Sequence, residues 1–134
     1  MIRRPGKKGS PGGSLDRQYG TLRYGWAVVP SVAVVGDGGF AMLMAELTTA
    51  VANKLPVKII ILKNNSLAEV KFEQIEIGNP EYGCTLAPID FVAFAKACGA
   101  DGFRCERPEE VRSAIQAALN SPGVAIVEAL VDAE

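Results

Sequence analysis

Two short polar segments in this 134-residue chain have the residue types and spacing to bind a metal-bound anion. The first, residues 36–39, reads Gly-Asp-Gly-Gly and follows the apolar run 32–35. The second, residues 63–66, reads Lys-Asn-Asn-Ser and follows the apolar run 57–62. Glycines let a backbone approach a phosphate closely, and a helix that begins there offers free N–H groups. Asp37 repels a bare phosphate, so this arrangement is favourable only when a divalent cation lies between carboxylate and phosphate.

The second segment supplies what such a cation needs. Mg²⁺ prefers six oxygen ligands in octahedral geometry. Asp37 offers a carboxylate, Asn64 a side-chain oxygen, and the turn after Asn64 a main-chain carbonyl. Two phosphate oxygens and a water would complete the shell, which predicts a bound diphosphate. A Gly-Asp-Gly or an Asn-Asn alone is more often an ordinary turn, and the two together at the ends of apolar runs favour the binding site.

The elements that position these segments follow from hydrophobic periodicity. The apolar runs 32–35, 57–62 and 124–131 are typical of buried parallel strands, and residues 102–105 form a shorter candidate strand. Between the first two runs, apolar residues recur at three- and four-residue steps, which predicts one helix ending before Pro56. A loop or short helix is expected up to about residue 76. Two further helices are expected, one capped by Asp90 and ended by Gly99, the other from Pro108 to Leu119.

This alternation predicts an α/β fold, a single three-layer domain with a mostly parallel sheet flanked by helices. Ligands in such sheets bind at the carboxyl ends of the strands, where both polar segments lie. The formal net charge of −1 is unevenly distributed, because residues 1–25 carry six Lys or Arg and one Asp. Rich in glycine and proline, residues 1–25 are expected to form a mobile basic arm, and residues 26–134 the folded domain. The arm makes nucleic acid a possible but unfavoured partner.

Several classes of site and location are disfavoured. The chain has no histidine, so a zinc site would need an unusual ligand set and no histidine base is available. No apolar run approaches the ~20 residues of a membrane span, and no secretory signal is evident. Cys84, Cys98 and Cys105 include no CxxC and are expected to be small core residues in a reducing cytoplasm.

At this point the sequence resembles a known family. Gly36-Asp37-Gly38, then 25 residues, then Asn64-Asn65 is similar to the signature of thiamine diphosphate enzymes. The likeness extends over residues 32 to about 131, through GDGGFAMLMAELTTAV, KLPVKIIILKNNSL and GNPEYGCTLAPIDFVAFAKACGADGF. These stretches look like the cofactor domain of the pyruvate oxidase, pyruvate dehydrogenase (quinone) and acetolactate synthase branch. The resemblance therefore implies a thiamine diphosphate-binding fold, with thiamine diphosphate and Mg²⁺ as cofactors.

The resemblance also implies which residues hold the cofactor. The metal ligands would be Asp37, Asn64 and the main chain of Ser66. The wider cofactor-binding set comprises Gly36, Asp37, Gly38, Gly39, Phe40, Asn64, Asn65, Ser66, Leu67, Ala68, Glu69 and Val70. Two positions depart from the family pattern. Lys63 stands where many members have a first Asn, and Ala68 replaces a common Gly, which would strain the loop if that position needed a positive φ.

In this family a second domain, usually from another subunit, binds the aminopyrimidine ring and supplies an activating glutamate. No acid in this chain matches that glutamate, so no catalytic residue is named and enzymatic activity stays open. The first hypothesis is an isolated thiamine diphosphate- and Mg²⁺-binding domain, inactive alone. The second is a subunit of a split enzyme of pyruvate or related 2-keto-acid metabolism, paired with a separate pyrimidine-domain chain. The third is a protein that keeps only the fold. Self-association as a homo-oligomer, and no membrane partner, is expected under all three.

Overall fold

The computed structural model describes residues 15–16, 21–24, 27–28 and 30–132. Its main sheet has four parallel strands in the order β4 (Ser31–Gly36), β5 (Val57–Lys63), β7 (Ala125–Leu130) and β6 (Asp101–Cys105). Three shorter strands, β1 (Leu15–Asp16), β2 (Thr21–Tyr24) and β3 (Ala27–Val28), pair antiparallel with one another. The predicted α/β class and parallel sheet are confirmed. Of the predicted arm 1–25, only 15–16 and 21–24 are described, and the rest lies outside the described residues.

The strand register decides which residues meet at the carboxyl end of the sheet. Gly36 of β4 lies opposite Leu62 of β5, and Lys63 lies opposite Leu130 of β7. All three strands therefore end at the same level. Asp37, the residue after β4, and Asn64, the residue after β5, consequently emerge side by side at this edge.

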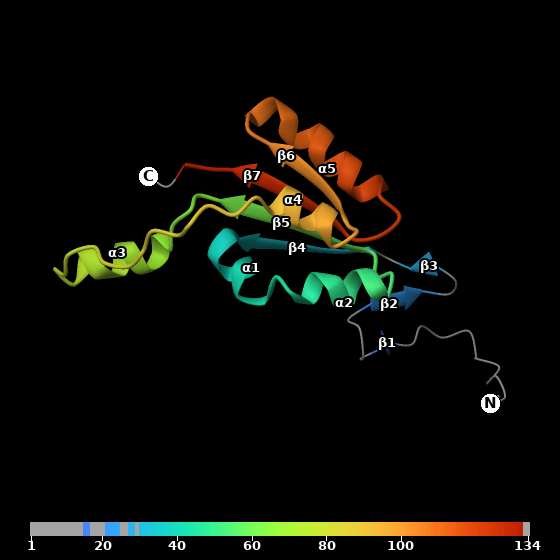
Figure 1. The fold of residues 1–134 in the computed structure, drawn as a ribbon, viewed down its shortest axis with the longest axis horizontal. Coiled ribbons are helices and arrows are strands. Elements are labelled where there is room, and N and C mark those ends of the chain that lie inside the picture. The colour runs from blue at the N-terminus through green and yellow to red at the C-terminus, as the bar shows by residue number, and fades with distance from the viewer. Residues whose placement is uncertain (1–14, 17–20, 25–26, 29, 133–134) are drawn as a thin grey trace.

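Helices cover the two faces of the sheet unequally (Figure 1). On one face, Leu47 of α2 (Glu46–Ala52) and Phe91 of α4 (Phe91–Ala97) pack against Ile61 and Ile126. On the other, α5 (Val111–Asn120), preceded by the 3₁₀ turn η1 (Pro108–Glu110), packs against β6 and β7. Successive strand residues point to opposite faces, so Ile126 enters the first core and its neighbours in β7 enter the second. This is the three-layer arrangement that the sequence predicts.

Two expectations about the first strand and helix are wrong in part. Val32 and Val34 are 53% and 61% exposed, because α5 covers β6 and β7 and leaves that face of the edge strand β4 open. The predicted single helix is two, α1 (Asp37–Leu43) and α2, separated by a turn at Met44 and Ala45 that redirects the chain. Leu43 is therefore exposed, while Leu47 enters the core.

The remaining predicted elements are confirmed. Asp90 caps α4 by accepting a hydrogen bond from Ala93 N at 2.8 Å, and Gly99 ends that helix with φ +84°. Cys84 and Cys105 are buried and Cys98 is half-buried, and no described cysteine forms a disulfide. Within the described residues, no helix is long and apolar enough to cross a membrane.

Helix α3 (Ala68–Glu76) projects from the carboxyl end of the sheet, away from the other helices (Figure 1). None of its residues is buried. The returning chain is tied back to it, because Gln74 donates to Tyr82 O and accepts from Tyr82 N, each at 3.0 Å. Helix α3 and the returning segment 77–86 therefore form one arm, called here the α3 arm.

Candidate functional site

A groove of about 360 Å³ lies where β4 and β5 end and the α3 arm begins. It is lined by Gly36, Asp37, Gly38, Gly39, Leu62, Asn64, Ser66, Leu67, Ala68, Glu69, Val70 and Val131. Ten of the twelve cofactor-binding residues predicted from the sequence are in this lining. The structure thus brings the two polar segments together, although 23 residues separate them in the chain.

Asp37 is the chemically distinctive residue of the groove. Its side chain is only 4% exposed. Its Oδ1 accepts a hydrogen bond from Gly38 N at 2.9 Å, and its Oδ2 accepts one from Asn65 N at 2.7 Å. No Lys or Arg of the described chain forms an ion pair with it. Buried carboxylates are normally paired or bound to metals, so this one offers a negative site for a cation.

The turn after β5 places the other two predicted metal ligands. Asn64 and Ser66 both line the groove, and Asn64 Oδ1 accepts a hydrogen bond from Ser66 N at 2.9 Å. Asn65 between them has a φ of +54°, a left-handed conformation that asparagine tolerates better than most residues. Its own main chain is engaged, since Leu86 N donates to Asn65 O at 2.8 Å. Hydrogen bonds therefore fix this turn, and Asn64 and Ser66 line the same groove as Asp37.

The three glycines in the groove have different roles. A Cβ on Gly38 would lie 2.7 Å from Leu67 Cδ2 and 3.1 Å from Leu86 Cδ1, so any larger residue there would force the Leu67 side chain to move. A Cβ on Gly36 or Gly39 would meet nothing within 4 Å. Neither of these two glycines has a positive φ. Packing and conformation leave both positions free to be larger, and the open space beside them suits the close approach of a ligand.

The donor set as a whole fits a diphosphate-bound divalent cation. It offers one buried carboxylate, one amide oxygen and the main chain of the turn, all of them hard oxygen ligands. No described group of three or more His, Cys, Asp or Glu side chains is arranged to hold a metal. The groove lining also contains no Lys or Arg. A diphosphate would therefore need the cation itself to balance Asp37 and Glu69.

Two predicted residues lie outside the groove lining, and one predicted strain is absent. The Phe40 side chain packs in the core, edge-on to Phe91 with ring centroids 5.4 Å apart. Asn65 contacts the site through a hydrogen bond from its backbone N–H to Asp37 Oδ2. Ala68 begins α3 and has no positive φ, so the replacement of glycine there strains nothing.

Sequence reasoning missed three residues at this end of the sheet. Leu62 and Val131 line the groove, and their roles follow from strand register, which the sequence does not reveal. Glu128 is fully buried in β7 and forms an ion pair with Lys63 at 3.2 Å. A lone acidic residue within the apolar run 124–131 was the available signal for it.

Beside this ion pair, the pKa values of Asp90 and Arg104 are shifted in the directions that favour their charged forms. The pKa of Asp90 is lowered from its ordinary value, first by the hydrogen bond from Ala93 N and then by Arg104, whose Nη2 lies 2.8 Å from Asp90 Oδ1. The pKa of Arg104 is raised, chiefly by the same bond. Both groups are thus charged at neutral pH.

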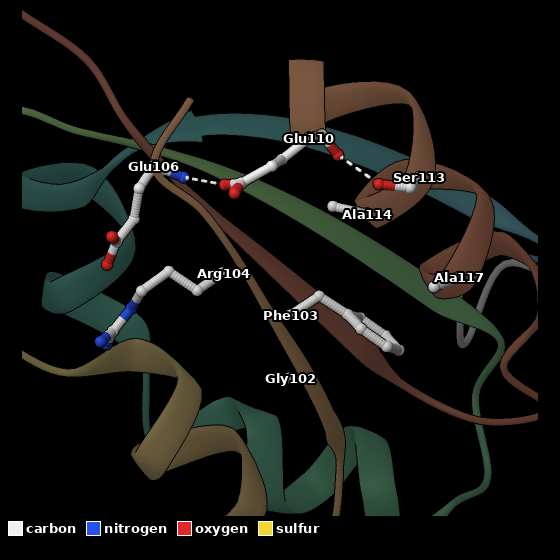
Figure 2. A pocket seen from close by; sticks show the side chains of 8 residues that line it. All are labelled: Gly102, Phe103, Arg104, Glu106, Glu110, Ser113, Ala114 and Ala117. Atoms are coloured by element: carbon white, nitrogen blue, oxygen red, sulfur yellow. Dashed lines mark hydrogen bonds between the residues drawn. The ribbon is translucent and has the colours of Figure 1, made fainter. Parts of the chain in front are cut away.

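A larger hollow of about 610 Å³, between the edge of β6 and α5, is chemically poorer (Figure 2). Its Glu110 carboxylate accepts from Glu106 N at 2.9 Å, and its Ser113 hydroxyl donates to Glu110 O at 2.8 Å. The Glu110 pKa is lowered by the bond from Glu106 N and then by Arg107. Figure 2 shows the Arg104 side chain extending away from Phe103 and α5, consistent with its ion pair to Asp90. The Glu110 carboxylate and the Ser113 hydroxyl of this hollow are thus hydrogen-bonded within the protein.

Comparison with known proteins gives consistent matches over most of this chain. Residues 23–129 match the family described as thiamine pyrophosphate enzyme, C-terminal TPP binding domain. The YdaP protein of Bacillus subtilis (strain 168), which carries the provisional name of a thiamine pyrophosphate-containing protein, is 40% identical over 104 residues. An acetolactate synthase of the same organism is 34% identical over 101 residues. These matches cover 78% and 75% of this chain.

A solved structure has a similar fold over most of this chain. The crystal structure of benzoylformate decarboxylase from Polynucleobacter necessarius superimposes with a TM-score of 0.72 and 27% identity, covering 78% of this chain. The chain spans 18% of the length of each of the two curated relatives and 20% of the decarboxylase.

Proposed function

This chain belongs to the thiamine pyrophosphate enzyme family and carries its C-terminal cofactor-binding domain, and we propose that it binds thiamine diphosphate with Mg²⁺ in the groove at Asp37. The observation that carries this proposal is the buried Asp37 carboxylate, which has no basic partner in the described chain and faces an open groove. Asp37, Asn64 and the main chain of Ser66 would hold the metal.

The other groove residues have supporting roles in this proposal. Gly36 and Gly39 leave room for the diphosphate, since side chains there would project into open space. Leu67 and Leu86 pack close to Gly38, within 2.7 and 3.1 Å of where its Cβ would lie. When bound, the cofactor supplies an electron sink for cleaving a bond next to a carbonyl group. The chain's own contribution is to bind and orient the diphosphate end.

We propose a 2-keto acid as the substrate class and expect these 134 residues to be inactive by themselves. The support is the acetolactate synthase and decarboxylase names of the relatives, of which the chain spans about a fifth. In the groove the only acids are Asp37 and Glu69, and Asp37 is committed to the metal. A split enzyme with a separate pyrimidine-domain chain is the second candidate, and a fold-only protein the third.

The expected partner surface adjoins the groove. Large apolar side chains on α1 and on the α3 arm are exposed: Met42 by 75%, Leu43 by 73%, Phe72 by 55%, Ile75 by 53% and Ile77 by 73%. Exposed apolar side chains of this size favour self-association or a pyrimidine-domain partner. Sedimentation of the chain over a range of concentrations tests this, and a monomer throughout would contradict self-association.

We also propose the cytoplasm as the compartment and retain the division into a basic arm, residues 1–25, and a binding domain, residues 26–134. The free thiols of Cys84, Cys98 and Cys105 support a reducing compartment. Removing residues 1–25 tests the division, because cofactor affinity should be unchanged.

Calorimetric titration tests the main proposal. Thiamine diphosphate should bind when Mg²⁺ is present and fail to bind when it is absent. Asp37→Asn should lower the affinity more than about 100-fold, since even an outer-shell partner of a metal is worth about 10–100-fold. Glu109→Gln is the control, because this exposed carboxylate lies on η1, outside the groove lining. Absence of binding by the unmodified chain in every condition overturns the proposal.

A further inference from the structure

We propose that Lys63, through its buried ion pair with Glu128, is a positioning residue of the cofactor site: it holds the carboxyl end of β5 against α4 and so fixes the turn that carries Asn64 and Ser66. This inference rests on the proposed function. It gives a role to Lys63, which stands where many members of the resembled family have an asparagine.

Lys63 is committed to contacts on the side away from the groove. Its side chain is 10% exposed, and its Nζ lies 3.2 Å from Glu128 Oε1 and 2.5 Å from Ile89 O. The same ammonium lies 5.8 Å from the centroid of the Phe91 ring. An ammonium group is buried only when paired and hydrogen-bonded, and here every partner is at least 26 residues away in sequence. These contacts therefore hold separate elements together.

Glu128 extends the connection to the start of α4. It is fully buried, and its Oε2 accepts hydrogen bonds from Phe91 N at 2.9 Å and Val92 N at 3.3 Å. Its Oε1 also lies 3.4 Å from Nη2 of Arg104, which pairs in turn with Asp90. Two cations and two carboxylates thus form a neutral cluster. Loss of Lys63 removes one of the two cations from the buried Glu128 carboxylate and leaves only the partly exposed Arg104, which is unfavourable.

The cluster acts on the metal-ligand turn through the backbone. Asn64 follows Lys63 directly, and Lys63 O accepts a hydrogen bond from Val131 N at 3.0 Å. On the other side, Asn65 N is bonded to Asp37 Oδ2. The turn is therefore held between an anchored strand end and the buried Asp37 carboxylate. Because Mg²⁺ demands near-ideal octahedral geometry, a small displacement of this strand end moves Asn64 out of reach.

The chain offers a matched control at the other end of the same strand. Lys58 is also buried, at 2% exposure, and its Nζ binds Ser121 O at 2.7 Å and Gly123 O at 2.5 Å. Lys63→Met and Lys58→Met should both lower thermal stability. Only Lys63→Met should weaken binding of thiamine diphosphate with Mg²⁺, by about 10–100-fold, the range for outer-shell partners of a metal. Lys63→Arg should restore part of that affinity.

Affinity in Lys63→Met equal to that of the unmodified chain, or an equal loss in Lys58→Met, overturns the inference. If Lys63→Met does not fold, Glu128→Gln replaces it, since the amide keeps the shape and removes the charge. The two proposals fail separately. Absence of cofactor binding by the unmodified chain overturns the proposed function. Amide hydrogen exchange at Asn65 then still measures the positioning, and exchange no faster in Lys63→Met than in Lys58→Met contradicts it.

Discussion

The amino end and the carboxyl end of β5 each hold a buried lysine, and the two lysines have different kinds of partner. Lys58 at the amino end binds two carbonyls of the turn between α5 and β7, and burial lowers its pKa while Asp101 partly opposes that shift. Lys63 at the carboxyl end binds a buried carboxylate and a carbonyl before α4. Lys58 therefore connects β5 with a single turn, whereas Lys63 connects three elements: β5, β7 and the start of α4.

Hollows exist at both ends, so a hollow alone does not mark the functional end. The amino-end hollow has about 330 Å³, close to the groove's 360 Å³. Its Asp101 carboxylate is already hydrogen-bonded to the Ser121 hydroxyl. At the carboxyl end, Asp37 is buried and accepts only backbone hydrogen bonds. A buried carboxylate with no basic partner is what distinguishes the site.

The largest expected loss of stability comes from a substitution in the buried middle of β5, between its two ends. Ile61 is fully buried in the middle of β5. Ile61→Ala should lower the free energy of unfolding by about 2–5 kcal/mol, because it leaves a cavity in the core. Urea denaturation measures the loss, and exchange at amides of both ends should rise together. Faster exchange at one end alone would show that the ends are independent.

A change confined to the carboxyl end comes next. Gly38→Ala should cost about 1–3 kcal/mol, because its Cβ would lie 2.7 Å from Leu67 Cδ2 and force that side chain to move. Gly39→Ala is the matched control for stability, since its Cβ meets nothing within 4 Å. If a ligand occupies that open space, Gly39→Ala should lower cofactor affinity without changing the urea midpoint. An unchanged affinity in Gly39→Ala would place the diphosphate elsewhere.

The ion cluster behind the carboxyl end should respond to acid. Asp90→Ala should lower the free energy of unfolding at neutral pH through loss of the α4 cap. The Asp90 pKa is lowered in the folded chain, so its contribution is complete above its ordinary value of 3.8 and is lost as pH falls through the lowered value. Unfolding measured from pH 7 downward should show the difference between variant and unmodified chain shrinking below about pH 4. A constant difference would contradict this.

The smallest effect is expected at the amino end. Ser121→Ala removes the hydroxyl bonded to Asp101, an exposed interaction that should be worth less than about 1 kcal/mol. Cofactor affinity measured by calorimetry should not change. A loss of affinity here would show that the two ends of β5 are coupled, and would weaken the contrast between them.

Local patterns predicted most of the fold. The sequence predicted the cap at Asp90, the glycine after α4 and the helical start at Pro108, because each depends on residues within one turn. The break at Met44 and Ala45 was not readable, since the apolar spacing there continues without a stop signal. The exposure of Val34 was not readable either, because it depends on where α5 packs.

By itself the sequence determined the order of elements and the polar residues at two strand ends, because turns and strand periodicity are local properties. Only the tertiary structure decided that Asp37 has no basic partner among the described residues and that Lys63 points away from the groove toward Glu128. Lys63 and Glu128 lie 65 residues apart. Their contact depends on strand register and helix packing, which bring distant residues together through the whole core and leave no local signal.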